Sequence, residues 1–497
     1  MTMNREIELI REIYHTGNVE EAIRLTDEML ERQPDHPELL NIAGVCNLKI
    51  KNYVAAEDYL HRSVRVAPRS ADVMNNLGVL YRETGRQEEA ERWFRCAIAV
   101  VPNHEQALCN LGLLLRWKRH LKDAEDLLSG AVREVPESHR LLNMLGMILK
   151  DRGRLDHAQT IFRQALALQP HNTDYKLNLG NLLLYQGNWQ SGLPLFEARC
   201  ATESQGAYAS PPPVSFPQWR GESIEGASLL VWPEQGLGDE IQLSRYIRRI
   251  KERGATRVTL VCSAAALRLF SALTEVDAIV AREAFDPSIC AVHDFWTYIW
   301  SIPLNLRERP WSGSSGLPYL NVSAGAGLKW EHRIPKGRLR VGVVWRGNPA
   351  NPNDYFRSLP ALNVLERLWE IPGVVFVCLQ KGVSETALRS EIGDRFILNL
   401  GNRVTDLADV AAIISRLDLV IGVDTAVVHL AAALGKPTWI LLANVATDWR
   451  WGSDGVTSEL YPGVVSLFRQ GVDDVDWSGV VTRVADALSS SQKRKGA

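Results

Sequence analysis

The sequence predicts an array of helical hairpins followed by an α/β region that contains two parallel sheets. Over the first 200 residues, proline returns at a constant step of 34, at Pro34, Pro68, Pro102, Pro136 and Pro170. After residue 226, short runs rich in valine and leucine alternate with helical stretches. Such alternation is typical of parallel sheets with helices on both faces. The two observations together predict an α-solenoid followed by an α/β half.

Small residues keep the same step in the first part. The step holds in two registers, at Ala22, Ala56, Ala90, Ala124 and Ala158 and at Gly44, Gly78, Gly112, Gly146 and Gly180. Each unit has two stretches with helical apolar spacing and a break such as Thr84-Gly85-Arg86 between them. Proline then ends the second helix because it lacks a backbone amide. We expect five hairpins from about Met3 onward and a degenerate sixth from Thr173, which together fill residues 1–200.

These units resemble tetratricopeptide repeats. The unit that begins at Ala71 matches the pattern at Leu77, Gly78, Tyr81, Ala90, Phe94, Ala97 and Pro102. Stacked repeats form a superhelix whose inner surface commonly binds extended peptides. The resemblance therefore implies a protein or peptide partner for the first part.

Three asparagines share one position of the repeat, namely Asn76, Asn110 and Asn178. The repeats are similar to those of O-linked N-acetylglucosamine transferases, in which an asparagine ladder lines the groove and holds peptide backbone. Here Ile42 and Met144 interrupt the ladder. The interpretation is a partial peptide-binding ladder, and the alternative is that asparagine is merely tolerated on that helix face.

A change of composition marks the boundary between the two parts. Residues 201–226 lack hydrophobic periodicity and include Pro211-Pro212-Pro213, so we predict a linker there. Strands are predicted by apolar runs, at Leu229–Trp232, Arg257–Cys262, Val341–Trp345, Val374–Leu379, Leu419–Val423 and Thr438–Leu442. A loop-like stretch over 321–337 divides them into two Rossmann-type domains, 227–330 and 331–497.

Ligands of open α/β sheets bind beyond the carboxyl ends of the strands. The first predicted strand ends in a loop that contains Gly238 and Asp239, and an amphipathic helix over Ile241–Arg253 follows. Glycine permits close backbone approach to a ligand. The third glycine of a dinucleotide fingerprint is absent, because isoleucine stands there. Asp239 is a candidate catalytic acid or base, and the alternative is an acid that stabilises a helix start.

Two later loops supply candidate donor-binding residues. Trp345, Arg346 and Asn348 follow one predicted strand, with Arg357 further on, and Gln380 follows the next strand. Arginine forks suit phosphate oxygens. An aromatic ring could pack against a base or sugar, and an amide could read a nucleobase edge or a sugar hydroxyl. A plain polar loop is the alternative for Gln380.

A fourth loop has the most distinctive pattern. A buried strand leads directly into Asp424 and Thr425, and His429 lies one turn along the following helix. We expect Asp424 and Thr425 to cap this helix and to leave its first amides open to a diphosphate. The alternative for His429 is a buried histidine that is satisfied within the core.

The spacing of Asp424, Thr425 and His429, with the pair Gly238-Asp239, resembles the heptosyltransferase-like glycosyltransferases of family 9. The segments Asp448-Trp449-Arg450-Trp451 and Phe468-Arg469-Gln470 are similar to those of bacterial repeat-bearing members. This resemblance implies the two-domain GT-B fold, an inverting reaction without a metal or other cofactor, and Asp239 as general base. The family usually has glycine where Ala426 stands and lysine where Arg357 stands.

An Asp474-Val475-Asp476 triplet mimics the metal motif of the other glycosyltransferase fold, but it precedes a helix predicted over Trp477–Leu488. Acids that cap this helix explain the triplet better than a metal site does.

Composition excludes several other classes. With 56 basic and 58 acidic residues mixed along the chain, nothing indicates nucleic-acid binding. Neither a signal peptide nor a membrane span is indicated, and the seven cysteines are scattered singly. We therefore expect a soluble, cytoplasmic protein.

The leading functional hypothesis is transfer of a sugar from a nucleotide-diphosphate donor to a hydroxyl of a protein or peptide held by the repeats. The main alternative is a non-catalytic scaffold with a degenerate sugar-nucleotide domain, since repeat arrays are often adaptors. A role in lipopolysaccharide core assembly is weaker, because that task needs no peptide groove.

Overall fold

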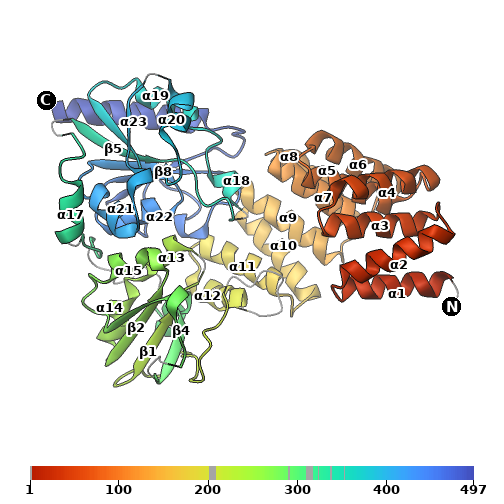
Figure 1. The fold of residues 1–497 in the computed structure, drawn as a ribbon, viewed down its shortest axis with the longest axis horizontal. Coiled ribbons are helices and arrows are strands. Elements are labelled where there is room, and N and C mark those ends of the chain that lie inside the picture. The colour runs from red at the N-terminus through yellow and green to blue at the C-terminus, as the bar shows by residue number, and fades with distance from the viewer. Residues whose placement is uncertain are drawn as a thin grey trace. The chain divides into compact units, whose positions relative to one another are not determined.

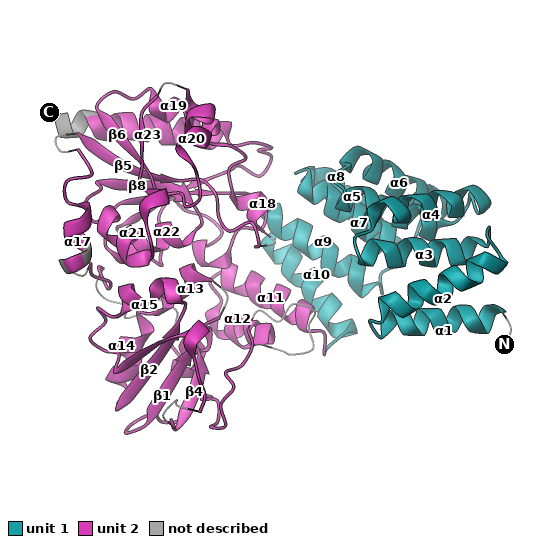
Figure 2. Cartoon of the chain, viewed as in Figure 1, with its two compact units in different colours: residues 1–170 teal, residues 171–497 magenta. Residues whose placement is uncertain are grey.

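The computed structural model describes residues 3–200, 209–234, 236–288, 292–308, 317–322, 324–335, 338–351, 353–393 and 395–496. The chain divides into two compact units, residues 1–170 and residues 171–497 (Figure 2). The first unit is helical, and the second combines a helical hairpin with two parallel sheets (Figure 1). The predicted fold class, an α-solenoid followed by an α/β region, is confirmed.

The first unit consists of helix hairpins that repeat at the predicted step. Its helices are α1 (Met3–His15), α2 (Val19–Arg32), α3 (Pro37–Lys49), α4 (Tyr53–Val66), α5 (Ala71–Glu83), α6 (Gln87–Val100), α7 (Glu105–Trp117), α8 (Leu121–Glu134), α9 (His139–Asp151) and α10 (Leu155–Leu168). Many begin at a polar cap, as where Ser70 Oγ accepts the amide of Val73 at the start of α5. The buried alanines of the repeat lie on the second helix of each hairpin, as Ala90 does on α6.

The repeated glycine is explained by the packing of each hairpin. On α5, a Cβ added to Gly78 would lie 2.4 Å from Cε1 of Phe94 on α6. A Cβ on Gly146 would likewise lie 2.6 Å from Cε1 of Phe162. These positions therefore need glycine so that a large side chain of the second helix can lie directly against the first.

We expect Gly78→Ala to destabilise the first unit by about 1–3 kcal/mol, because the new methyl group overpacks the contact with Phe94. The measurement is the melting temperature of the full chain followed by far-ultraviolet circular dichroism. Gly85→Ala serves as a control for overpacking, because its new methyl group would meet open space. Any loss of stability in that variant reflects backbone strain at the φ of +77°. A Gly78→Ala protein with unchanged stability would contradict this account of the repeat.

The second unit begins with a sixth hairpin and continues into a sheet of four parallel strands in the order β3-β2-β1-β4. Its elements up to the crossover are α11 (Thr173–Tyr185), α12 (Trp189–Phe196), η1 (Glu197–Cys200), β1 (Ser228–Trp232), α13 (Leu237–Leu243), α14 (Tyr246–Glu252), β2 (Arg257–Cys262), α15 (Ala264–Phe270), β3 (Ala278–Ala281), η2 (Arg282–Ala284), β4 (Phe295–Tyr298), η3 (Ile299–Ser301) and α16 (Ile302–Leu306).

A second sheet of six parallel strands follows, in the order β10-β9-β8-β5-β6-β7. Its elements are α17 (Ala324–Trp330), β5 (Leu339–Val344), α18 (Asp354–Arg357), η4 (Leu362–Leu365), α19 (Glu366–Trp369), β6 (Val374–Cys378), α20 (Glu385–Ile392), β7 (Ile397–Asn399), η5 (Gly401–Arg403), α21 (Leu407–Ile414), β8 (Leu419–Val423), α22 (Ala426–Ala433), β9 (Thr438–Leu442), η6 (Trp449–Trp451), β10 (Val465–Arg469) and α23 (Ser478–Gly496). The long helix α23 packs against α19 and β10 in the second part of this unit.

All six predicted strands are present, and the structure adds β3, β4, β7 and β10. The helix predicted over Ile241–Arg253 is instead two helices, α13 and α14. The break falls where Ser244 Oγ donates to the carbonyl of Ile241 and Arg245 Nε donates to that of Gln242. Such side-chain bonds to the preceding turn compete with a regular helix. The loop predicted over 321–337 contains α17, whose Trp330 is fully buried.

The division between the units lies one hairpin earlier than the boundary that the sequence predicts. Leu184, Leu193 and Phe196 of the sixth hairpin belong to the same buried cluster as Val231 of the first sheet. Apolar packing therefore makes this hairpin part of the α/β unit.

A buried ion pair fastens the sixth hairpin to the loop after β1. Arg199 Nε and Nη2 donate to Glu234 Oε2 at 2.7 Å and to Oε1 at 3.2 Å, and both side chains are 0 % exposed. Arg199 also donates to Glu197 and Ser301, so the buried guanidinium is surrounded by acceptors.

Part of the predicted linker is packed against the first sheet. Residues 201–208 lie outside the described residues, whereas Trp219 and Ile224 are buried in the core of the second unit. The amide of Trp219 donates to the carbonyl of Trp296 on β4 at 2.7 Å. Residues 209–226 thus follow an edge of the sheet, and they lack helices and strands as their proline content predicts.

Candidate functional site

The loop after β1 meets the helix that follows β8, because α13 packs against α22 (Figure 1). A Cβ on Gly238 would lie 3.1 Å from Cδ2 of His429 and 3.7 Å from Cα of Ala426. Gly238 therefore serves the close approach of these two helices. The contact brings Asp239, of the first sheet's loop, beside the first turn of α22.

The start of α22 is chemically open. Thr425 is the N-cap, but its side chain makes no capping bond. Its Oγ1 is buried and has no hydrogen-bond partner among the described residues. The first amides of a helix lack acceptors within it and favour an anion. The first amides of α22 and the unused hydroxyl are therefore candidate donors to an anionic ligand.

Asp424 was predicted to cap α22, but in the structure it does not. Its Oδ1 lies 3.3 Å from Nε2 of His429. Burial raises the pKa of Asp424, but the hydrogen bond from His429 and the charges of Arg450 and Arg357 outweigh it and hold the pKa well below its ordinary value. Asp424 is therefore a carboxylate held by His429 at the carboxyl end of β8.

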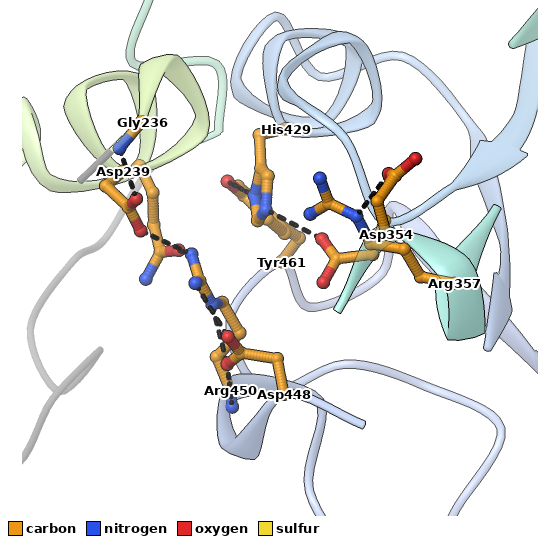
Figure 3. A network of polar contacts seen from close by, with 10 residues as sticks. Gly236, Asp239, Asp354, Arg357, His429, Asp448, Arg450 and Tyr461 are labelled. Carbon is orange, nitrogen blue, oxygen red and sulfur yellow. Dashed lines mark hydrogen bonds and ion pairs between the residues drawn. The ribbon is translucent and has the colours of Figure 1, made fainter. Parts of the chain in front are cut away.

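His429 is buried, with 2 % of its surface exposed. Its Nδ1 lies 2.9 Å from Oη of Tyr461 (Figure 3). Its ring stacks on Trp451 with centroids 5.2 Å apart. Both ring nitrogens thus have protein partners. A buried histidine of this kind organises the loop, and its role toward a donor stays a prediction.

Asp239 occupies the third position of α13 and accepts hydrogen bonds on both oxygens. The amide of Gly236 donates to Oδ2 at 3.0 Å, and Arg450 Nη1 donates to Oδ1 at 2.8 Å (Figure 3). Its side chain is 9 % exposed. The helix-start interpretation is thus realised in the fold, and one further lone pair on each oxygen is compatible with a role in proton transfer.

Arg450 is a site residue that sequence reasoning missed. The family-like segment from Asp448 to Trp451 was its only signal, and it gave no role. In the structure Arg450 Nε and Nη2 donate to the two oxygens of Asp448, each at 2.8 Å. Its Nη1 donates both to Asp239 and to Gln242 Oε1. Arg450 therefore joins η6, which follows β9, to α13, which follows β1.

The predicted donor residues after β5 mostly stabilise their own loop. Gln380 Oε1 accepts from the amides of Trp345 at 3.3 Å and Arg346 at 3.0 Å. Arg346 Nε donates to the carbonyl of Leu359 at 3.4 Å, and Nη2 donates to that of Pro360. Trp345 is 1 % exposed in the core of the second sheet. The prediction that its ring packs against a base or sugar is corrected, because the ring packs against protein.

Arg357 remains a candidate anion ligand. Its Nε donates to Asp354 Oδ1 at 3.1 Å (Figure 3). Its side chain is 25 % exposed. A Cβ on Gly347 would lie 2.6 Å from Nη2 of Arg357, so glycine lets the guanidinium lie against the loop backbone. Asn348 is exposed, and its Oδ1 accepts the amide of Ala350 in a turn.

The asparagines of the repeats are bonded to one another along the first unit. Asn76 Nδ2 donates to Asn41 Oδ1, and Asn110 Nδ2 donates to Asn75 Oδ1, both at 2.9 Å. Arg82 Nη1 donates to Asn110 Oδ1 at 3.0 Å. The ladder is therefore double, with each bond spanning 35 residues between neighbouring repeats. Asn178, the third predicted member, belongs to α11 of the second unit.

The acidic triplet before α23 acts as the helix-start interpretation expects. Asp476 Oδ1 accepts from the amide and hydroxyl of Ser478, the first residue of α23. Asp474 Oδ2 accepts the amide of Gly471 at 2.7 Å. Both acids thus stabilise backbone turns.

Models of known families match segments in both parts of the chain. Models of the tetratricopeptide repeat match residues 37–103, 109–173 and 143–205. The model of glycosyltransferase family 9 (heptosyltransferase) matches residues 352–445. The chain therefore carries tetratricopeptide repeats in its N-terminal part and a heptosyltransferase-like domain towards its C-terminus. The family match includes Arg357, Gln380, Asp424, Thr425 and His429.

The chain is also similar to individual proteins at low sequence identity. Protein FlbA of Caulobacter vibrioides is 27 % identical over 333 residues, which are 62 % of this chain and 53 % of FlbA. The chain thus spans about half the length of the curated relative that it matches. The solved structure of PilF from Pseudomonas aeruginosa is similar at 18 % identity, with a TM-score of 0.36, over 41 % of this chain and 94 % of PilF. The type IV pilus biogenesis factor PilW is similar at 19 % identity, with a TM-score of 0.36, over 41 % of this chain and 96 % of PilW.

Within the described ranges, none of the helices has the length and apolar character that crossing a membrane requires.

Proposed function

We propose that this protein transfers a sugar from a nucleotide-diphosphate donor to a hydroxyl acceptor, with inversion and without a metal, and that the acceptor is a protein or peptide held by the repeats. The family 9 domain supports glycosyl transfer in general. The single observation that carries the donor assignment is the unused buried hydroxyl of Thr425 at the open start of α22.

The start of α22 suits the diphosphate. The amides of Ala426 and Val427 and the Thr425 hydroxyl offer donors to phosphate oxygens, and the helix dipole favours the negative charge that grows as the sugar leaves. The Arg357 guanidinium acts on Asp424 from nearby and adds positive charge to this edge. Fixed donors of this kind can stabilise a leaving diphosphate without a cation.

Asp239 is the proposed general base. The contact of Gly238 with Ala426 and His429 keeps it next to the first turn of α22. A base must lie close to both the acceptor hydroxyl and the donor sugar. A carboxylate that takes the proton as the hydroxyl attacks gives a single displacement, and hence inversion.

The repeats are the proposed acceptor-binding surface. The bonded pairs Asn41–Asn76 and Asn75–Asn110 hold their amides in fixed directions. An amide group retains further donors and acceptors that can pair with the backbone of an extended peptide of any sequence. The scattered single cysteines support a cytoplasmic setting for this reaction.

One observation favours a second candidate, a non-catalytic scaffold. Both oxygens of Asp239 already accept hydrogen bonds from the protein, as a purely structural acid would. On that account the repeats recruit a partner and the α/β unit binds a sugar nucleotide without transferring the sugar.

We expect a nucleoside diphosphate sugar to raise the melting temperature of the parent protein, because a ligand of the folded state stabilises it. Thr425→Val should raise the dissociation constant of the donor roughly tenfold, because the variant loses about one hydrogen bond to a charged group. It should not lower the stability of the free protein, since the hydroxyl has no partner to lose within the described residues.

Thr447→Val is the matched control for that experiment. Its hydroxyl is bonded to the carbonyl of Ala443, so its loss should cost stability but not donor affinity. Equal donor affinity in the parent and in Thr425→Val would sink the assignment of the diphosphate to α22.

A further inference from the structure

The segment η6 is held in place on both sides of Arg450. Trp449 packs edge-on against Trp189 and Phe196 of the sixth hairpin and against Trp300 after β4, with centroids 5.5, 5.8 and 5.3 Å apart. Trp451 stacks on His429 of α22. Arg450 thus lies between two buried tryptophans that are anchored to different elements.

The guanidinium of Arg450 is held in one orientation by Asp448. Asp448 accepts on both oxygens from Nε and Nη2, and its Oδ1 also accepts the amide of Arg450 at 3.0 Å. The Trp300 ring lies 5.4 Å from the Arg450 Cζ. The side chain is 10 % exposed. A planar fork in this setting has essentially one conformation.

One nitrogen of that fork points at the first sheet's loop. Nη1 lies 2.8 Å from Asp239 Oδ1 and 3.0 Å from Gln242 Oε1, and both acceptors belong to α13. With the amide of Gly236 on the other oxygen, the carboxylate of Asp239 is held at two points on two different oxygens. Neither of its side-chain torsions is then free.

We propose that Arg450 is a positioning residue for the transfer reaction, oriented by Asp448 and orienting Asp239. This inference rests on the proposed function, in which Asp239 takes the proton from the acceptor. Asp239 belongs to the first sheet's part of the unit, and Arg450 belongs to the second's. The two-point hold on the base therefore exists only while the two α/β parts are in contact, and this couples that contact to catalysis.

A second arginine links the two α/β parts without contacting Asp239. Arg268 on α15 donates to Asp409 on α21 at 2.8 Å and lies 3.2 Å from Asp406, so it also bridges the two parts. Removing it weakens the bridge without touching Asp239. Arg268→Gln is therefore a matched control that separates positioning of the base from general contact between the parts.

The test compares Arg450→Gln, Asp448→Asn and Arg268→Gln with the parent in turnover and in donor affinity. We expect Arg450→Gln to lose about a hundredfold in kcat, the scale set by misplacement of a catalytic group, with the donor dissociation constant changed less than about twofold. Asp448→Asn keeps the charge of Arg450 and should lose less. Arg268→Gln should keep kcat within about twofold.

Crystal structures of the variants give a readout that does not depend on activity. The carboxylate of Asp239 should leave its observed orientation in Arg450→Gln and keep it in Arg268→Gln. If Arg450→Gln does not fold, Asp448→Asn tests the same orientation, because the fork that has lost one acceptor oxygen can turn and carry Nη1 away from Asp239. Absence of transfer by the parent would contradict the proposed function alone. An unmoved Asp239 in folded Arg450→Gln, or in Asp448→Asn if that is the variant that folds, would overturn the role of Arg450.

Discussion

Asp239→Asn is expected to abolish most sugar transfer while the protein remains folded and still binds its donor. A general base contributes roughly a hundredfold to ten-thousandfold in rate, and an amide cannot take the proton. The asparagine oxygen can replace only one of the two carboxylate oxygens, so it accepts from Gly236 or from Arg450. The NH₂ group then faces the other donor and cannot accept from it. We therefore expect a stability loss of about 1–3 kcal/mol, much smaller than the effect on rate.

The measurement is transfer from a labelled donor, with donor affinity and melting temperature recorded for the parent and the variant. Ser358→Ala serves as a comparison, because its hydroxyl is bonded to Asp354 and to the amide of Gly347, away from Asp239. Near-normal turnover in Asp239→Asn would remove the catalytic assignment. It would leave the hydrogen bonds of Asp239 as its whole role, as the scaffold account requires.

Arg199→Met is expected to destabilise the second unit by about 3–5 kcal/mol, the usual cost of removing one partner of a buried ion pair. The substitution leaves Glu234 0 % exposed and without its ion-pair partner, with the Trp300 amide as its remaining donor in the described structure. The sixth hairpin should loosen first, because Arg199 follows α12 directly. Urea unfolding followed by tryptophan fluorescence measures the effect, since Trp189, Trp300 and Trp449 lie at this seam.

Arg248→Met provides the control for that measurement. Arg248 pairs with Glu252 at 3.1 Å, but the two side chains are 68 % and 41 % exposed. An exposed pair contributes about 0–1 kcal/mol, so the control should stay close to the parent. Equal, small effects of Arg199→Met and Arg248→Met would show that the hairpin is held by apolar packing alone.

The repeats could be predicted from the sequence because their packing is local. Gly78 and Phe94 are only 16 residues apart. Gly44, Gly112 and Gly146 likewise face a leucine or phenylalanine 16 residues later, so the pattern itself records the contact. The strands with strong apolar runs could be predicted for a different reason. A continuous apolar run reflects burial on both faces of a sheet. β3, with four residues of intermediate burial, and β7, with three residues, are too short for such a signal.

The site was predicted less completely because its contacts join distant segments. The pair Asp239–Arg450 spans 211 residues, and only the fold brings the two loops together. Trp345 was misjudged because alternate residues of a strand face opposite sides of the sheet, and its position next to a loop does not reveal which side it faces. Gly238 was predicted to approach a ligand, whereas its nearest neighbours in the structure are His429 and Ala426.

The start of α22 is expected to bind the diphosphate of a sugar nucleotide beside Asp239. A crystal structure of the full chain with a nucleoside diphosphate would show this. We expect phosphate oxygens within hydrogen-bonding distance of Thr425 Oγ1 and of the amides of Ala426 and Val427, with Arg357 close to the same group. A nucleotide bound elsewhere, or a diphosphate that leaves the Thr425 hydroxyl without a partner, would contradict it.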